Sequence, residues 1–179
     1  MNLIVLILIL IAVIGLIAIV FILNYNKFQW FIIKIKKGET NIISLLEEKH
    51  SILTRYTDIL KEETGFNDSL DEYNYNKRTS INDLNKKVND FNNLINKYMD
   101  NNEKLLKKDN IININKELDE INILINGSKK YYNDNLVNYN HLCHKFPSLI
   151  IAKIFKYKDK DFQEEKVKEE LKILNEKDE

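Results

Sequence analysis

The sequence has few of the residues that interrupt the backbone. Its 179 residues include one proline and four glycines. Because proline and glycine are the strongest breakers of regular structure, their scarcity predicts long uninterrupted elements, which we interpret as helices. The chain also has a single cysteine, Cys143. An internal disulfide is therefore excluded, and a reducing compartment is favoured.

An excess of charge of either sign is also lacking, since Lys plus Arg and Asp plus Glu each number 27. A basic excess would favour nucleic acid as a partner, and an acidic excess would favour a disordered tail. The sequence shows no phosphate-binding glycine loop, no cysteine-pair zinc motif and no paired-carboxylate site. We therefore expect a protein that is not an enzyme, with no catalytic residues, no cofactor, no nucleic-acid partner and no small-molecule substrate.

One long apolar run lies at the N-terminus. Every residue from Leu3 to Leu23 is apolar or glycine. About 20 such residues at about 1.5 Å each match a hydrocarbon core of about 30 Å. A cleaved signal peptide would have a basic beginning and a small-residue cleavage site, and this sequence has neither. We predict a retained transmembrane anchor over residues 1–26, with the lipid bilayer as its partner.

The residues after the run predict its orientation in the cell membrane. The run is preceded by no lysine or arginine and is followed by Lys27, Lys34, Lys36 and Lys37. Because lysine and arginine accumulate on the cytoplasmic side, we expect a single-pass protein with its N-terminus outside and its C-terminal domain in the cytoplasm. Three aromatic residues, Phe28, Trp30 and Phe31, should lie at the headgroups. The expected interface anchors are Trp30, Phe31, Lys34, Lys36 and Lys37, and remodelling of the lipid surface by residues 27–37 is a further hypothesis.

Apolar residues at helical spacing continue after the anchor. Between residues 32 and 60 two seven-residue series lie side by side: Leu45, Ile52 and Ile59, and Leu46, Leu53 and Leu60. This helix should end near Thr64 and Gly65, because glycine readily adopts the left-handed conformation of a C-cap. The polar residues 67–69 can then cap the next helix.

Two more helices follow from the same kind of pattern. In the second, two series alternate, Ile81, Val88 and Ile95 with Leu84, Phe91 and Tyr98, until the pattern breaks at residues 99–103. In the third, the series is Ile111, Leu118, Ile125, Tyr132, Tyr139 and Phe146. Pro147 should stop this helix, because proline lacks an N–H group and restricts the preceding residue.

These elements predict an all-α fold, in which an N-terminal transmembrane helix precedes an antiparallel up-and-down bundle of three long helices and a short fourth. The bundle should occupy residues 27–162, followed by a charged tail over residues 163–179. The apolar segment 148–157 either closes the bundle as its fourth helix or lies against the membrane. A coiled-coil dimer is the main structural alternative.

A cluster of His141, Cys143 and His144 is the best candidate for chemistry. Residues three apart share a helix face, so His141 and His144 can share a metal ion, and Cys143 can act as a thiolate. Two ligands do not make a site, and His50 is the only other histidine. We therefore predict no metal site, and we keep a metal- or redox-responsive bundle as the alternative function.

The stretch around these residues resembles the C-terminal pattern of the LemA family of bacterial membrane-anchored helical proteins. The matching signature residues are Tyr132, Asn133, Val137, Tyr139, Asn140, Phe146, Pro147, Ile151, Ala152, Phe155 and Phe162. A weaker match includes Lys49 and His50. The sequence departs from the family pattern at Thr54, Asn122, Lys153 and Lys156, and the last two stand where the family often has glycine.

The resemblance implies a single-span anchor that carries a cytoplasmic helical bundle and has no established catalytic activity. We expect a scaffold or adaptor whose partner is a membrane protein, such as a protease, or a second copy of the chain. The signature tyrosines follow the buried series, where their hydroxyl groups need partners. Asn133 and Asn140 lie one position off that series, where we expect them to hydrogen-bond a neighbouring helix.

Overall fold

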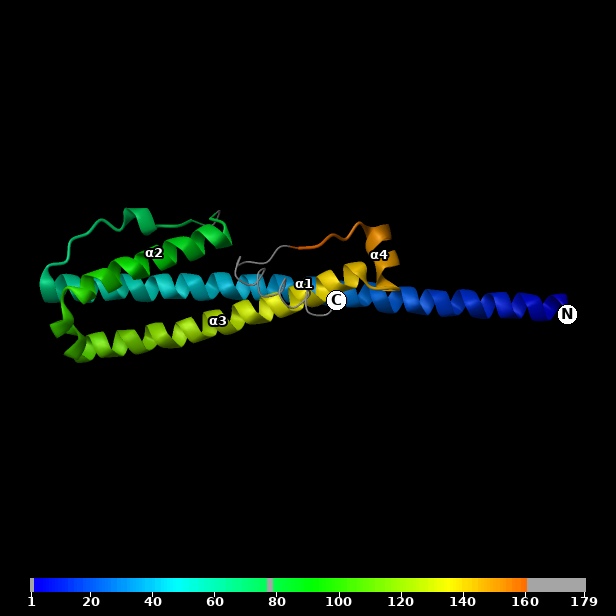
Figure 1. Cartoon of the computed structure of the whole chain (residues 1–179), viewed down its shortest axis with the longest axis horizontal. Coiled ribbons are helices and arrows are strands. Elements are labelled where there is room, and N and C mark those ends of the chain that lie inside the picture. The colour runs from blue at the N-terminus through cyan, green and yellow to red at the C-terminus, as the bar shows by residue number, and fades with distance from the viewer. Residues whose placement is uncertain (1, 77–78, 161–179) are drawn as a thin grey trace, which may run out of the picture. The chain divides into compact units, whose positions relative to one another are not determined.

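The computed structural model describes residues 2–76 and 79–160, and throughout these two ranges the regular elements are helical. Phe162 and the predicted tail at 163–179 lie outside the described residues. The elements, in chain order, are α1 (Leu3–Thr64), η1 (Asp71–Tyr73), α2 (Ile81–Asp100), η2 (Glu103–Lys107), α3 (Asp109–His144) and α4 (Ser148–Phe155) (Figure 1). The predicted all-α class is confirmed.

The apolar run and the first amphipathic stretch form one continuous helix, α1. A window of 18 residues near its N-terminus has a mean hydropathy of 3.7, and none of that window is buried. α1 is therefore long and apolar enough to cross a membrane. It ends at Thr64, and Gly65 follows with a φ of 72°. The predicted end at this glycine is confirmed, because the left-handed region suits a residue without a Cβ atom.

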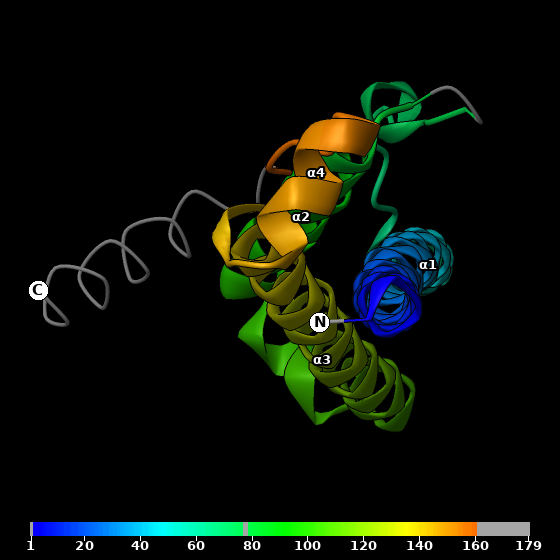
Figure 2. The ribbon, with the colours of Figure 1, turned by 90° about the vertical axis from the view of Figure 1, so that its right-hand side faces the viewer.

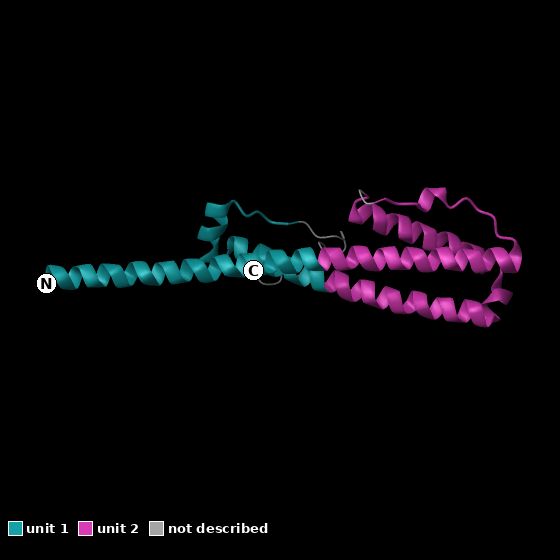
Figure 3. Cartoon of the chain, turned by 180° about the vertical axis from the view of Figure 1, so that it is seen from behind, with its two compact units in different colours: residues 1–37, 131–179 teal, residues 38–130 magenta. Residues whose placement is uncertain are grey.

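The chain divides into two compact units (Figure 3). We call residues 38–130 the central unit, and residues 1–37 with 131–179 the terminal unit. Both α1 and α3 contribute residues to both units. The boundaries expected from the sequence, at residues 26 and 162, rest on the membrane anchor and the bundle, and they remain predictions.

The central unit has an aliphatic core. Of the two series expected in α1, Leu46, Leu53 and Leu60 are buried, and Leu45 and Ile59 are partly exposed. Side chains of α1 pair with side chains of α3 in opposite chain order: Asn41 with Ser128, Arg55 with Glu117, and Glu63 with Asn110. Within this unit the two helices therefore run in opposite directions.

The start of α2 differs from the prediction. Residues 67–69 begin no helix, and the Oγ of Ser80 instead accepts a hydrogen bond from the Asp83 N–H at 3.1 Å. The reason lies just after α1, where Phe66 is buried and its ring meets that of Tyr98 at 4.8 Å. This contact holds the chain as it leaves α1, and α2 begins at Ile81, where the Ser80 side chain caps one of its free N–H groups.

The end of α3 also differs. Five members of the predicted series, Ile111 to Tyr139, are buried, but Phe146 is 75% exposed. The heptad spacing places Phe146 in the core only if the helix reaches it, and α3 ends at His144. Pro147 then lies directly before α4, with a cis peptide bond from Phe146. The prediction that Phe146 is a core residue was wrong.

Candidate functional site

Aromatic rings from three segments meet in the terminal unit. Phe28 of α1 is fully buried, and its ring centroid lies 5.7 Å from that of Tyr139 and 4.8 Å from that of Tyr157. Phe155, the last residue of α4, contacts Tyr25 at 5.0 Å and Phe21 at 6.2 Å between ring centroids. We call these six residues the aromatic junction: Phe21, Tyr25, Phe28, Tyr139, Phe155 and Tyr157. The junction fastens α4 and the end of α3 to α1.

The polar ends of the tyrosines in the junction have partners, as buried hydroxyl groups require. The hydroxyl of Tyr139 interacts with the thiol of Cys143, and the Nε2 group of Gln29 donates to the hydroxyl of Tyr157 at 2.8 Å. Burial raises the pKa of Tyr139 to about 12. Burial also raises the pKa of Tyr157. Both rings therefore remain neutral at physiological pH and act in packing and hydrogen bonding.

Asn140 holds the chain that follows α4. Its Nδ2 donates to the Lys160 carbonyl at 2.9 Å, and its Oδ1 accepts from the Lys160 N–H at 3.0 Å. The side-chain amide thus pairs with both backbone groups of one residue, as a residue in a neighbouring strand would. The Oδ1 atom of Asn133 is buried without a hydrogen-bond partner. The expectation that both residues bond a neighbouring helix was wrong, because the segment after α4 occupies the position beside Asn140.

The structure separates the members of the His-Cys-His cluster. Cys143 is 5% exposed, and burial, followed by the charge of Asp159, raises the pKa of its thiol. His144 is exposed and its Nε2 lies 2.9 Å from Asp159 Oδ2, whereas His141 is exposed on α3. Within residues 2–76 and 79–160 no three His, Cys, Asp or Glu side chains gather as metal ligands would. A thiol that is buried and neutral is a poor nucleophile.

The expected interface anchors lie on α1, beyond the apolar run. Trp30 is 51% exposed, and the Lys34 ammonium lies 3.4 Å from the centroid of its ring. Phe31 packs edge-on against Trp30 at 4.7 Å, and Lys36 and Lys37 are exposed. Phe28, in contrast, is completely buried by the junction, so its ring packs on protein side chains.

α4 packs on the protein with one face. Ser148, Ile151 and Ala152 are buried, and Ile150 and Ile154 on the other side are exposed. Its C-cap is Lys156, whose φ of 56° and ψ of 34° are left-handed. The Tyr157 N–H donates to the Ala152 carbonyl at 2.9 Å, which closes the helix end. Segment 148–157 was expected to pack either on the bundle or on the membrane. Packing on the protein therefore covers only one face of α4.

Lys49 and His50, the basic pair of the weaker match, lie in the central unit. Lys49 is 6% exposed, and burial, followed by the charge of Lys129, lowers its pKa. The His50 ring packs against Phe91 at 5.4 Å between centroids, and its Nε2 lies 3.2 Å from the Tyr73 carbonyl oxygen. Burial lowers the pKa of His50. Both side chains are thus structural members of a packed region.

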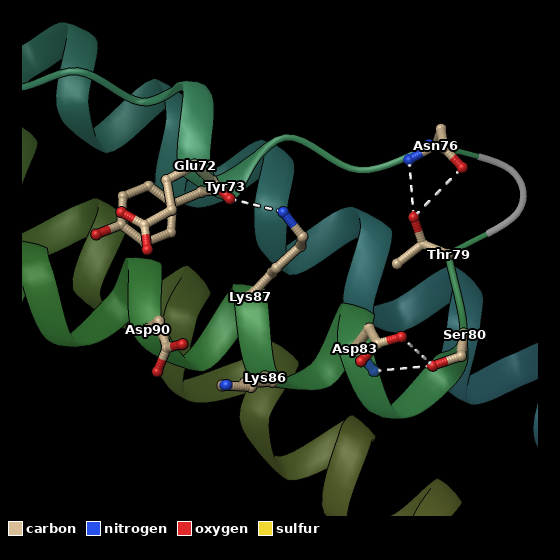
Figure 4. A pocket seen from close by; sticks show the side chains of 9 residues that line it. All are labelled: Glu72, Tyr73, Asn76, Thr79, Ser80, Asp83, Lys86, Lys87 and Asp90. Atoms are coloured by element: carbon tan, nitrogen blue, oxygen red, sulfur yellow. Dashed lines mark hydrogen bonds between the residues drawn. The ribbon is translucent and has the colours of Figure 1, made fainter.

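A recess of about 570 Å³ opens between η1 and α2 (Figure 4). The Lys87 ammonium crosses it to the Glu72 carbonyl oxygen at 2.6 Å, and Ser80 and Asp83 at its edge bond each other. Its charged side chains are Glu72, Asp83, Lys86, Lys87 and Asp90. Acidic side chains and lysines are mixed around the recess. It therefore offers neither the anionic cluster that a cation needs nor a basic cluster for phosphate.

Three residues of the site were missed by sequence analysis: Gln29, Tyr157 and Asp159. Each acts through a partner far away in the chain, so no helical period marks it. The only signal was indirect. Tyr139, Ala152 and Phe155, which the signature does include, contact Tyr157 in the structure.

The comparisons with known proteins identify the family of the chain. No curated protein and no solved structure matches the chain. The family model described as LemA family matches residues 42–173, which is more than half of the chain. That match includes the last turns of α3, all of α4 and the Tyr157 side of the aromatic junction. The chain belongs to the LemA family.

Proposed function

We propose that this protein is a single-pass, membrane-anchored helical scaffold with its central unit in the cytoplasm and without catalytic activity. The observation that carries the proposal is the aromatic junction at the end of the apolar run. Phe155 of α4 packs on Phe21 and Tyr25, and the run ends at Leu23. A folded structure attached so close to a run of this length is suited to holding partners at the bilayer surface.

Cys143, the candidate nucleophile of the chain, is poorly placed for catalysis. A nucleophile needs a nearby base and an accessible position. Cys143 is buried with a raised pKa, and its neighbour His144 faces Asp159 instead. The partner would be a membrane protein, such as a protease, or a second copy of the chain.

Impermeant maleimide labelling of intact cells tests the topology. Cys143→Ser removes the only native cysteine, and single cysteines then replace Asn2 or Asn101, both exposed. We expect Asn2→Cys to react from outside and Asn101→Cys only after permeabilisation. Labelling of Asn101→Cys in intact cells would contradict a cytoplasmic central unit.

Photo-crosslinking in the native membrane tests the scaffold role. Ile123 and Leu124 of α3 are 71% and 55% exposed, and a crosslinking amino acid at either position samples an apolar part of the central unit. The matched control is the exposed polar Glu120 of the same helix. We expect discrete adducts with a membrane protein or with a second copy from Ile123 and Leu124. Equal adducts from all three positions would indicate random collision and argue against a defined partner.

A further inference from the structure

Apolar side chains of α4, and that of Phe146 just before it, are exposed on the protein surface. Ile150 is 49% exposed, Ile154 is 58% exposed and Phe146 is 75% exposed. At about 100° per residue, Ile150 and Ile154 lie opposite the buried side of α4. Exposure of 44% to 72% is also found for the exposed side chains of the apolar run itself. These three residues are thus as uncovered as those that face lipid in a membrane-crossing helix.

α4 is located at the end of the apolar run. Its last residue, Phe155, contacts Phe21 within the run and Tyr25 just after it, at 6.2 and 5.0 Å between ring centroids. The run ends between these two residues, at Leu23. If α1 crosses a bilayer, the end of α4 is therefore level with the boundary of the hydrocarbon core.

The direction of α4 fits that boundary. Figure 2 shows α1 end-on and α4 from its side, and in Figure 1 α4 again stands across α1. A helix that lies across a membrane-crossing helix at the hydrocarbon boundary runs along the bilayer surface. An interfacial helix has this position, with an apolar face among the acyl chains.

The opposite side of α4 is already covered by the protein. Tyr157, directly after the helix, packs on Phe28 and Tyr139, and Ser148 and Ala152 are buried. Exposed lysines flank the uncovered side chains at Lys145, Lys153 and Lys156. Lysine stems lie along apolar surface while their ammonium groups reach the headgroups, so these charges are compatible with lipid around Ile150 and Ile154.

We infer that α4 is an interfacial membrane helix, and that its Ile150 and Ile154, together with Phe146 just before it, enter the acyl-chain region of the leaflet around the end of the apolar run. The inference rests on the proposed anchoring by α1 and adds a second lipid contact to it. The occupant of this face is the lipid of that leaflet. This contact between α4 and lipid would set the depth of the terminal unit in the membrane.

Tryptophan fluorescence of the full chain in vesicles tests this inference. Trp30→Phe removes the only native tryptophan, and single tryptophans then replace Phe146, Ile150 or Ile154 in separate proteins. The vesicles contain phosphatidylcholine and phosphatidylglycerol with or without bromine on the acyl chains. We expect brominated lipid to quench all three tryptophans about twofold or more, as for groups inserted at the acyl boundary.

Two control positions separate the possible failures. Leu16→Trp lies within the apolar run, and Ile123→Trp lies at a site of α3 that is 71% exposed in the central unit. We expect quenching for Leu16→Trp and none for Ile123→Trp. No quenching of Leu16→Trp would overturn the anchoring by α1, and with it the proposed function. Quenching of Leu16→Trp without quenching in α4 would overturn the present inference alone.

Two other results would also overturn it. Equal quenching of Ile123→Trp would mean that the whole protein adsorbs to lipid without a specific role for α4. Blue-shifted emission at Ile150 and Ile154 without quenching by brominated lipid would mean that protein covers this face, as in contact with a second copy. Circular dichroism of each variant checks that its helicity is unchanged.

Discussion

The contacts inside the central unit differ in kind from the contacts inside the terminal unit. The central unit packs mainly aliphatic side chains at heptad spacing, with Leu53, Val88 and Ile111 among its most buried residues, and includes a few buried rings such as that of Phe91. The terminal unit joins aromatic rings from α1, α3 and the chain after α4, and adds paired hydrogen bonds such as those of Asn140. Periodic contacts let long helices associate along their length, whereas the junction fixes one short segment at one place.

The largest expected effect is in the central unit. Phe91 is 1% exposed, stacks on Tyr73 at 5.0 Å and contacts His50. Phe91→Ala should reduce the free energy of unfolding by about 4 kcal/mol, because it removes a large buried ring and leaves a cavity. Urea unfolding of the full chain in detergent, followed by circular dichroism, measures this. Tyr131→Ala, at a residue 40% exposed, is the control and should cost less than about 1 kcal/mol.

The second prediction concerns the aromatic junction. Tyr139→Ala should cost about 3 kcal/mol and should increase amide hydrogen exchange most in residues 148–160, since the ring supports that segment. Tyr139→Phe keeps the ring and loses only the hydroxyl contact with Cys143, so it should cost about 1 kcal/mol or less. Equal costs for the two variants would show that the hydroxyl group, and not the ring, holds the junction.

The third prediction concerns the hydrogen bonds of the terminal unit. Asn140→Ala removes both bonds to Lys160 and should cost about 1.5 kcal/mol. Asn138→Ala is the matched control, because that amide donates only to the Asp134 carbonyl of its own helix. Thermal unfolding measures both variants, and we expect the control to stay within about 0.5 kcal/mol of the native protein. If Asn138→Ala lost more stability than Asn140→Ala, the bonds from Asn140 to Lys160 would not be a specific support of the terminal unit.

The fourth prediction concerns the cap of α2 in the central unit. Ser80→Ala should cost about 1 kcal/mol, because an N–H group of the first turn loses its acceptor. Ser69→Ala should have almost no effect, since that side chain caps no helix in the structure. The same unfolding measurement compares the two serines. A greater loss of stability for Ser69→Ala than for Ser80→Ala would support the helix cap that the sequence predicted at residues 67–69.

The smallest expected effect is a gain in stability. Lys156→Gly should stabilise the protein by about 0.5 to 1 kcal/mol, because glycine adopts the left-handed conformation of this residue without steric cost. Lys153→Gly, inside α4, should cost about 1 kcal/mol instead. Thermal unfolding of both variants checks the signs. Destabilisation by both would show that the Lys156 side chain contributes more than its backbone conformation costs.

The sequence predicted the central unit better than the terminal unit, because periodic contacts leave a pattern in the sequence and contacts between distant residues do not. Helical periods identified the central helices and five buried members of the α3 series, and Gly65 marked the end of α1, because these signals are local. Phe146 was misplaced, since the period alone does not tell where a helix ends. The burial of Phe28 was not predicted, because it depends on Tyr139 and Tyr157, which are distant in sequence. The family signature included two of the six junction residues, Tyr139 and Phe155, and it could not assign partners to Asn133 or Asn140.

The burial of Phe28 has a consequence for membranes of different thickness. Its ring is held between Tyr139 and Tyr157 only a few residues beyond Leu23. Sliding of α1 along its axis past α4 would pull this ring out of its contacts. In a bilayer thicker or thinner than the apolar run, the protein we propose would therefore adjust by tilting or by deforming the lipid around it. Hydrophobic mismatch would then be felt by the whole terminal unit and not by α1 alone.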